Sequence, residues 1–332
     1  MTPTLRKPLF GFVAAVVLGC CSAAMAAAPK YKLDVVRGDG AMPVPSAMVA
    51  INDEGEMIGT IYGLPDHSFT TVLARYTGRR SAAQLLPDSD AMEVAGINAA
   101  GDVLASEHGN SALWRHDGTR ETLDQLDRVT AINNIGHITG YQDTAAVVWK
   151  DGVADVLEGV DGQQVWVSDI NDSSVSVGTV DYMVGKKHRS DAAVWDAAGH
   201  LVRLTVAGAQ DADAQSINKQ GQVVGWATDG VDYFSFLYDA GIVTRLPQVH
   251  GDDIWQVVTI NDHGDVLGNQ GPVEGPVLWH KGVGYQLRDL LEDHGQDWQY
   301  LTAYDMNNSG QIVGWGRYKG KGHGFIAKRV KQ

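Results

Sequence analysis

The chain contains 332 residues but only two cysteines, Cys20 and Cys21, and both lie near its N-terminus. Downstream of Cys21 the sequence offers no thiol for a disulfide or for a cysteine-based metal site. Stability must therefore come from a hydrophobic core, and about 300 residues are enough to build a sizeable one.

Long apolar runs are also scarce. The run from Leu9 to Leu18 follows Arg6 and Lys7, is too short to span a bilayer comfortably, and precedes the small residues Ala24-Met25-Ala26. This pattern is typical of a signal peptide. We predict that residues 1–26 are removed and that residues 27–332 form one exported domain, periplasmic or secreted, without a transmembrane segment.

A lipoprotein signal is the alternative for the same segment. Val17-Leu18-Gly19-Cys20 resembles a lipobox, in which Cys20 would be acylated. Leu18 is an indifferent residue within a lipobox, so simple cleavage is the preferred interpretation, and lipidation of Cys20 stays open as the second.

Positive charge is in deficit. The formal net charge is −14, and it becomes −16 once Arg6 and Lys7 are removed with the leader. A net negative field argues against general nucleic-acid binding and favours solubility. We expect a monomer.

Catalytic motifs are missing too: the sequence contains neither His-Glu-x-x-His nor Gly-x-Ser-x-Gly. Pairs of acidic residues could bind Ca²⁺ or act as glycosidase carboxylates, although acidic loop residues more often serve only for solvation. These pairs are Asp88 and Asp90, Asp211 and Asp213, Asp252 and Asp253, and Glu292 and Asp293. We predict no cofactor and no catalytic residue, with Ca²⁺ as a weak alternative.

The sequence is rich, instead, in one repeated frame. The frame is Ile-Asn, two variable residues, Gly, one more variable residue, two apolar residues and Gly; it occurs in seven copies without an internal gap, with Met in place of Ile in the last. The copies begin at Ile51, Ile97, Ile132, Ile170, Ile217, Ile260 and Met306. Ser174 replaces the first Gly once, and Ala105 replaces the second Gly once.

The frame predicts a β-hairpin. Apolar residues alternate with polar ones on both sides of the turn, and Asn-x-x-Gly supplies the turn, because Asn bonds nearby backbone and Gly tolerates positive φ. We interpret the repeated Asn as turn chemistry and not as a ligand set. The second Gly indicates a close backbone approach, which we place near a crowded axis.

Two further strands follow each frame. The first ends in an aromatic residue or its counterpart before a Gly turn, and the second carries a Leu. The aromatic positions are Tyr76, Trp114, Trp149, Trp195, Tyr238 and Trp279, and the Leu positions are Leu85, Leu123, Leu157, Leu204, Leu246 and Leu287. We interpret the repeated Trp as core residues. Four strands in a mean period of 42.5 residues, over the 255 residues from Ile51 to Met306, match a propeller blade.

The strand count predicts how the ring closes. After the seventh frame, Gly324 to Val330 supplies a third strand and the chain then ends, whereas Tyr31 to Val36 is a spare strand before the first frame. Leu33 would take the place of the Leu in the fourth strands. We therefore predict an all-β, seven-bladed β-propeller of four-stranded blades, with the last blade closed by the N-terminal strand.

The repeat resembles a known family. Ile-Asn-x-x-Gly-x-Val-Val-Gly followed by an apolar strand ending in Trp is similar to the HAF repeats of exported bacterial proteins, over residues 31 to 330. His323-Gly324-Phe325 is the nearest match to the naming His-Ala-Phe, and Phe236 keeps the Phe alone. Ala112, Val147, Ala193 and Val277 stand where Phe would be expected. The resemblance implies a propeller-like exported protein, and it transfers no catalytic residues.

Loop lengths distinguish the two faces of the predicted ring. The step from each frame's first residue to the aromatic position varies from 17 to 25 residues, whereas the aromatic-to-Gly turn varies only from two to four. The longer loops and the blade-to-blade loops emerge on the same face. We predict that this face binds the ligand. The alternative is that the fold merely tolerates loops of different length there.

On that face, the residue after the second Gly is Tyr141, Trp226 or Trp315 in three copies. These rings could form an aromatic platform for sugars or peptide side chains, or they could pack between blades. Two cationic clusters lie in the loops of the fourth and seventh repeats: Lys186, Lys187, His188 and Arg189, and Arg317, Lys319, Lys321 and His323. They could bind an anionic group, or they could simply be solvated.

Two functions therefore stay open. The first is a non-catalytic exported binding or scaffold module that holds an extracellular or envelope glycan or protein on the variable-loop face. The second is a polysaccharide hydrolase or lyase that uses the loop carboxylates. Carboxylates and histidines converging on one pocket in the central channel would favour the enzyme.

Overall fold

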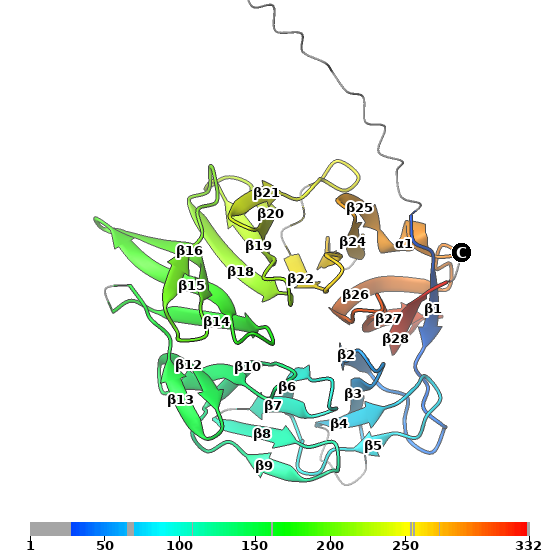
Figure 1. Ribbon diagram of the computed structural model, residues 1–332. Coiled ribbons are helices and arrows are strands. Elements are labelled where there is room, and N and C mark those ends of the chain that lie inside the picture. The colour runs from blue at the N-terminus through cyan, green and yellow to red at the C-terminus, as the bar shows by residue number, and fades with distance from the viewer. Residues whose placement is uncertain are drawn as a thin grey trace, which may run out of the picture.

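The computed structural model describes residues 28–64, 70–107, 109–160, 162–252, 254, 256–271 and 273–330. Within these residues the chain forms seven antiparallel sheets of four strands each, arranged in a ring around a central channel (Figure 1). The predicted seven-bladed β-propeller is confirmed. The predicted signal peptide, residues 1–26, lies outside the described residues.

Blades 1 to 3 follow the sequence order, with the first strand of each at the channel and the last at the outer rim. Blade 1 contains β2 (Ala47–Ile51), β3 (Met57–Tyr62), β4 (Thr71–Tyr76) and β5 (Gln84–Leu85). Blade 2 contains β6 (Glu93–Ile97), β7 (Val103–Glu107), β8 (Asn110–Trp114) and β9 (Arg120–Thr122). Blade 3 contains β10 (Arg128–Ile132), β11 (Ile138–Gln142), β12 (Ala145–Lys150) and β13 (Val153–Val156).

Blades 4 to 6 repeat this order. Blade 4 contains β14 (Val165–Ile170), β15 (Ser176–Val184), β16 (Lys187–Trp195) and β17 (Leu201–Arg203). Blade 5 contains β18 (Asp211–Ile217), β19 (Val223–Thr228), β20 (Tyr233–Asp239) and β21 (Ile242–Arg245). Blade 6 contains β22 (Gln256–Ile260), β23 (Val266–Asn269), β24 (Pro276–His280) and β25 (Val283–Gln286). The predicted fourth strand of blade 6 is present as β25. Leu287 follows it directly, begins a single helical turn, α1 (Leu287–Leu290), and is buried.

Blade 7 closes the ring. It consists of β26 (Trp298–Met306), β27 (Ile312–Tyr318), β28 (Lys321–Arg329) and the N-terminal strand β1 (Tyr31–Val35), which pairs antiparallel with β28 from Tyr31↔Arg329 to Val35↔Phe325. The predicted closure by the N-terminal strand is confirmed, and β28 begins three residues before the predicted Gly324. Pairing covers the edge of β28 that would otherwise be exposed.

One detail of the outer strands differs from the prediction. In blades 1 and 2, Leu86 and Leu123 each follow the outermost strand and donate their N–H to the carbonyl oxygens of Leu73 and Ser111. Val36 makes the same bond to Gly324 in blade 7. Leu86 and Val36 therefore occupy the positions predicted for Leu85 and Leu33. The reason is the pleat: a shift by an odd number of residues, one for Leu86 and three for Val36, turns a side chain from one face of the strand to the other.

The Asn-x-x-Gly segments form tight turns in all seven copies. In the first copy, the N–H of Asn52 donates to the carbonyl oxygen of Glu56, and the N–H of Gly55 donates to that of Asn52. Ser174 adopts a φ of 58° where the other copies have Gly, which is a backbone conformation that L residues seldom adopt. We call the face that carries these turns the Asn-turn face and the opposite face the loop face.

The second Gly of the frame is needed because the innermost strand is bulged. In blade 6 the register shifts between Val257 and Thr259, and a Cβ on Gly268 would lie 2.8 Å from the carbonyl oxygen of Gln256. The close backbone approach is confirmed. It lies between two strands of one blade, however, and not at the ring axis as predicted.

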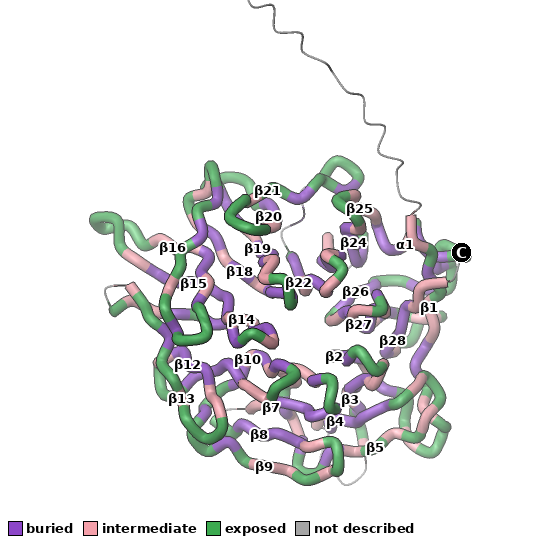
Figure 2. The backbone as a smooth tube through the Cα atoms, viewed as in Figure 1, coloured by how far each residue is buried: buried purple, intermediate pink, exposed green. Residues whose placement is uncertain are grey.

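Buried residues follow the strands of the blades (Figure 2). The core lies between neighbouring blades, as where Leu73 of blade 1 and Trp114 of blade 2 belong to one cluster. Trp114, Trp195 and Trp279, in blades 2, 4 and 6, are at most 2% exposed. Each indole N–H also donates to a backbone carbonyl that follows the outermost strand of the preceding blade; the acceptors are Pro87, Glu158 and Pro247, at 2.9, 2.8 and 2.9 Å. Each of these tryptophans therefore both fills a core and ties two blades together.

Candidate functional site

The Asn-turn face is organised by hydrogen bonds that repeat from blade to blade. Each Asn Oδ1 accepts the N–H of the residue four positions later, as Asn218 does from Gln222 at 3.0 Å. The side-chain amide of Asn218 donates to the carbonyl oxygen of Asn261 in the next blade at 3.0 Å. The amides of Asn52, Asn133, Asn171, Asn261 and Asn307 make the equivalent bond. The repeated Asn therefore provides turn chemistry, as predicted, and also joins the blades.

The residues that follow these Asn side chains form a second belt. The N–H of Asn308 donates to Asp53 Oδ1 at 2.8 Å, and the amide of Asn308 donates to the other carboxylate oxygen at 2.8 Å. The N–H groups of Ala99, Asn134, Lys219 and Asp262 donate in the same way to Asn134, Asp172, Asp262 and Asn308. These polar residues are therefore engaged in holding the ring together.

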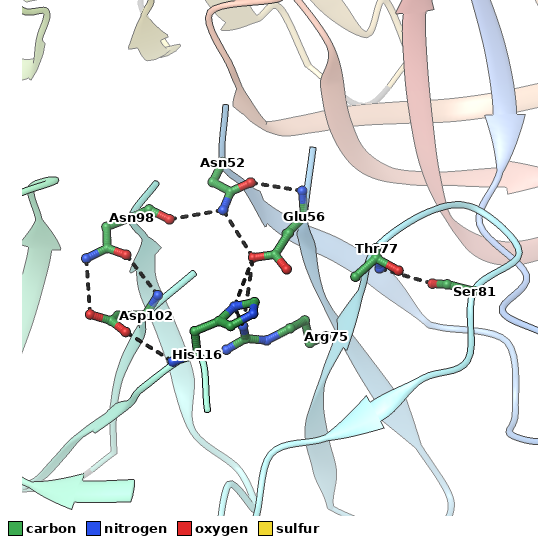
Figure 3. Close-up of polar contacts among 8 residues, drawn as sticks. All are labelled: Asn52, Glu56, Arg75, Thr77, Ser81, Asn98, Asp102 and His116. Atoms are coloured by element: carbon green, nitrogen blue, oxygen red, sulfur yellow. Dashed lines mark hydrogen bonds and ion pairs between the residues drawn. The ribbon is translucent and has the colours of Figure 1, made fainter. Parts of the chain in front are cut away.

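A cluster of titratable side chains lies between blades 1 and 2 on the same face (Figure 3). Arg75, only 3% exposed, has one guanidinium nitrogen 2.8 Å from His116 Nδ1 and 3.8 Å from Glu56 Oε2. A side chain at Gly101 would meet all three groups. Opposite charge near a buried guanidinium offsets its desolvation, so the cluster stabilises the contact between the two blades.

The channel contains two half-buried carboxylates, on the residues that precede the frames of blades 4 and 7. Asp169 accepts two hydrogen bonds from blade 5, one from the N–H of Ile217 at 3.0 Å and one from Ser216 Oγ at 2.8 Å. Asp305 accepts from Ile51 in blade 1 at 2.8 Å. Burial raises the pKa of Asp305 to about 6, and burial also raises that of Asp169. Both carboxylates line one cavity of about 360 Å³.

The loop face differs in its exposed side chains. Among the described residues, the exposed aromatic side chains at or near the loop-face ends of strands are Tyr62, Trp166, Tyr233 and Tyr300. Trp166 is 46% exposed, and its indole N–H donates to Asp181 Oδ2 at 3.2 Å. One further exposed aromatic, Tyr304, lies near the Asn-turn end of β26 and lines the channel cavity. In the Asn turns and on the outer rim, the large exposed apolar residues are aliphatic: Ile135, Val153, Val156, Val202 and Ile242.

The three predicted aromatic positions differ in their surroundings. Tyr141 is buried between blades 3 and 4, and its hydroxyl accepts the N–H of Val167 at 2.9 Å. Trp226 is partly buried and packs on Tyr233, with ring centroids 5.6 Å apart. Trp315 is partly buried in blade 7. Trp226 and Trp315 therefore keep some surface on the loop face, whereas Tyr141 has little.

The first cationic cluster lies at the tip of the β15–β16 hairpin. Lys186, Lys187 and His188 are exposed, and His188 Nε2 lies 3.3 Å from Asp181 Oδ2. Arg189 donates to Gln210 Oε1 at 3.0 Å and lies 3.6 Å from Asp211. Nearby acidic groups thus neutralise part of the cluster, and the two lysines extend furthest from them.

The second cationic cluster lies at the β27–β28 hairpin of blade 7. Arg317, Lys319 and Lys321 are exposed, and Lys319 Nζ lies 3.4 Å from Asp297 Oδ2. His323 is partly buried, and burial together with Arg37 and Lys321 lowers its pKa. Blades 5 and 6 separate this hairpin from blade 4 on one side of the ring and blades 1 to 3 on the other, so the two cationic clusters do not form one patch.

The predicted acidic pairs are spread over four connections of the ring. Asp88 and Asp90 precede blade 2, Asp211 and Asp213 begin blade 5, Asp252 precedes blade 6, and Glu292 and Asp293 precede blade 7. Asp253 lies outside the described residues. None of the described members lines the channel cavity. The described residues include no group of three or more His, Cys, Asp or Glu side chains placed to hold a metal ion.

Sequence reasoning missed Arg75 and the channel carboxylates. A signal for the latter was present, because the residue before each frame is Ala50, Gly96, Ala131, Asp169, Ser216, Thr259 or Asp305, and it becomes polar only from the fourth copy onward. The helical content of the described chain is limited to segments too short or too polar to cross a membrane.

Comparisons with known proteins show only the fold of this chain. No family model matches the chain, and no curated protein matches it, so the resemblance to HAF repeats stays a prediction. Among solved structures, YCF48 bound to D1 peptide has a TM-score of 0.56 at 10% identity, covering 92% of this chain and 99% of that one. Acylaminoacyl peptidase from Pyrococcus horikoshii has a TM-score of 0.56 at 10% identity, and the chain covers only 52% of its length. At these identities the likeness shows a shared propeller fold.

Proposed function

We propose that the protein is a non-catalytic binding module that holds a protein or glycan ligand on its loop face. The observation that carries this proposal is the exposure of aromatic side chains, such as Trp166 and Tyr233, at the loop-face ends of strands in four of the blades. Large rigid rings with a polar edge are the side chains that binding surfaces favour. The Asn-turn face, in contrast, uses its polar groups to join the blades.

The shape of blade 4 adds support. Strands β15 and β16 contain nine residues each, and their tip carries exposed Met183 and Val184 beside Lys186 and Lys187. Apolar side chains at the end of a long hairpin gain nothing for the core of their own blade. Such residues favour contact with a partner, and the lysines would contribute electrostatic attraction to an acidic one.

Of the two ligand classes, a polypeptide has the additional support of the comparison with YCF48. That structure contains a D1 peptide, and the propeller in it matches nearly the whole of this chain. A ring of the same architecture is thus able to present a peptide-binding surface, and we propose that this chain does so as well.

A binding experiment with arrayed peptides and glycans tests the proposal. The chain from residue 27 should bind a subset of the array, and Trp226→Ala and Trp315→Ala should weaken that binding at least about tenfold, since aromatic anchors often contribute more than 1.4 kcal/mol. Ile135→Ala, an exposed apolar change on the Asn-turn face, is the matched control and should bind like the wild type. Unchanged binding by both tryptophan variants would remove these residues from the site.

A polysaccharide hydrolase or lyase is the second candidate, and one observation favours it: Asp169 and Asp305 share the channel cavity, and the pKa of Asp305 is raised to about 6. Both carboxylates already accept backbone N–H groups from neighbouring blades, which explains their burial without catalysis. The test is the release of soluble products from polysaccharides. Release by the wild type, together with its loss in an Asp305→Asn variant that stays folded, would establish the enzyme.

We also propose that the mature chain is exported, because Arg6, Lys7 and the apolar run that follows form a signal peptide. Mass spectrometry of the purified protein decides between the two processing routes. Cleavage before Ala27 would give an unmodified N-terminus, whereas a lipoprotein would begin at acylated Cys20.

A further inference from the structure

In blades 3 and 6, the residue after the second Gly of the frame fills the joint to the next blade. The hydroxyl of Tyr141 accepts the N–H of Val167 in blade 4 at 2.9 Å. Asn269 performs the same task in blade 6, because it accepts the N–H of Ala303 at 3.0 Å and donates to its carbonyl oxygen at 2.9 Å. Val167 and Ala303 both lie three residues before the first residue of a frame, so the two joints are equivalent.

Between blades 2 and 3 this filling is incomplete. The residue in question is Ser106, whose hydroxyl is 3.5 Å from the N–H of Val129, the equivalent of Val167. Serine is shorter than tyrosine by a whole ring, and the joint contains a cavity of about 300 Å³ lined by Ser106, Glu93, Arg128 and Ser168, among others. That volume would hold roughly ten waters at about 30 Å³ each, and it reaches the lower end of the range of small-ligand pockets.

The cavity belongs to a longer groove. It shares Glu93, Ser106 and Arg128 with a second cavity of about 280 Å³, which extends outward along Asp127 and Gly109. On the other side it shares residues with the channel cavity, namely Val94, Ala95, Thr130 and Ser168. The three cavities therefore form a continuous path from the outer part of the loop face, through the joint, to the channel. We call this path the blade 2–3 groove.

Charge and shape indicate which ligand group the groove suits. The carboxylates of Glu93 and Asp127 line its outer part, and those of Asp169 and Asp305 line its inner end. Among the described residues of the two outer cavities, Arg128 is the one cation, and its guanidinium lies over the ring of Tyr141, 5.8 Å from the centroid. The described residues that line those two cavities include no aromatic ring on which a sugar would stack.

We propose that the blade 2–3 groove binds a cationic side chain, lysine or arginine, of an extended polypeptide that lies across the loop face. The alkyl stem would pass Ser106 and Ala95, and the ammonium or guanidinium would be drawn toward the carboxylates at the inner end. A negative, water-filled crevice attracts a cation and repels a carboxylate. This inference rests on the proposed function and assigns one class of partner to it.

Ser106→Tyr provides a direct test, because it places in this joint the residue that the fold already uses at Tyr141. The probes are fluorescein-labelled nine-residue peptides of Gly and Ser with a central Lys, Arg, norleucine or Glu, and fluorescence polarisation gives the Kd. The wild type should bind the Lys and Arg peptides at least about tenfold more tightly than the norleucine and Glu peptides. Ser106→Tyr should lose that preference. Thr60→Tyr, at the same position of the frame in blade 1, is the matched control and should keep it.

Glu93→Gln is a second variant, in case Ser106→Tyr does not fold. Glu93 is exposed, so the change leaves the core intact. It should weaken binding of the Lys peptide severalfold and leave binding of the norleucine peptide unchanged. Spermidine, as a free polyamine, should compete only weakly if the peptide backbone contributes; displacement of the Lys peptide by equimolar spermidine would overturn a polypeptide ligand in favour of a polyamine.

The failures are distinguishable. If peptides or glycans bind through Trp226 and Trp315 but Ser106→Tyr and Glu93→Gln have no effect on any probe, the proposed function stands and this inference is wrong. Preference for the Glu peptide, or equal Kd values for Lys and norleucine, would overturn it as well. If nothing binds to the loop face, both proposals fail.

Discussion

Blade 4 contains one tryptophan near each end of its sheet, and the two have different surroundings. Trp195, at the Asn-turn end of β16, is fully buried and donates to the carbonyl oxygen of Glu158 in the preceding blade. Trp166, at the loop-face end of β14, is 46% exposed and bonds to the carboxylate of Asp181 within its own blade. The first recurs at one fixed position of the repeat, and the second occurs in a single blade.

This comparison separates what builds the ring from what distinguishes this protein from any other ring. Residues that recur at a fixed position, such as Trp195 and Asn218, bond to an adjacent blade and are buried. Residues that break the pattern, such as Trp166 and Ser106, lie toward the loop face and leave surface or space free. Repetition in the sequence thus indicates structure, and departures from it indicate binding.

The largest expected effect comes from replacing each of the two tryptophans with alanine. Trp195→Ala leaves a cavity in the core and an unpaired carbonyl on Glu158, and it should reduce the free energy of unfolding by about 3–5 kcal/mol. Trp166→Ala removes an exposed ring and should cost less than about 1 kcal/mol. Urea denaturation followed by circular dichroism measures both. Similar losses for the two variants would contradict the distinction between the two ends of the blade.

An intermediate effect is expected from the belt of Asn side chains. Asn218→Asp keeps the oxygen that accepts the N–H of Gln222 but removes the amide that donates to Asn261, so a carboxylate would face that carbonyl. We expect a loss of about 1–3 kcal/mol, because the acceptor of a buried bond is left unsatisfied.

Asp229 on the loop face is the comparison for that variant. It accepts the N–H groups of Val231 and Asp232 within its own exposed loop, at 2.8 and 2.9 Å. Asp229→Ala should leave the urea midpoint almost unchanged. A midpoint as low as that of Asn218→Asp would show that local loop bonds matter as much as bonds between blades.

The ring was predicted well because the same sequence frame recurs once in each blade. Seven copies of one frame gave the blade count, and the spare strand around Tyr31 gave the closure. Positions within strands were less certain: Leu86 and Val36 took the places predicted for Leu85 and Leu33, since apolar residues close together in sequence do not reveal which of them points to the core. The short helix at Leu287 was missed for the same reason, as a buried Leu suits either structure.

The candidate site was less predictable, because it depends on distances between blades. No sequence spacing shows that Ser106 leaves a cavity against Arg128, or that Asp169 and Asp305 share the channel cavity. The position after the second Gly was recognised as interesting through its aromatic members. The small member, Ser106, was overlooked, although the missing ring is what opens the groove.

The last expected effect is a dependence of stability on pH that belongs to Asp305 in the channel. Its pKa is raised from 3.8 to about 6 by burial, so between pH 4 and 6 the folded chain binds a proton that the unfolded chain does not. The stability that this group contributes is therefore greatest below pH 4 and is lost as the pH rises through 6. The difference in free energy of unfolding between the wild type and Asp305→Asn should fall over that window.

Asp229, on the loop face, should show the opposite dependence of stability on pH. The N–H groups of Asp232 and Val231 lower its pKa below 3.8, so its contribution is present above that value and is lost as the pH falls through the lower folded-state pKa. The difference between the wild type and Asp229→Asn should accordingly stay flat from pH 4 to 7. If it instead falls as the pH rises, or if the Asp305→Asn difference stays flat, the carboxylates of the channel and of the loop face do not differ in the way that their burial implies.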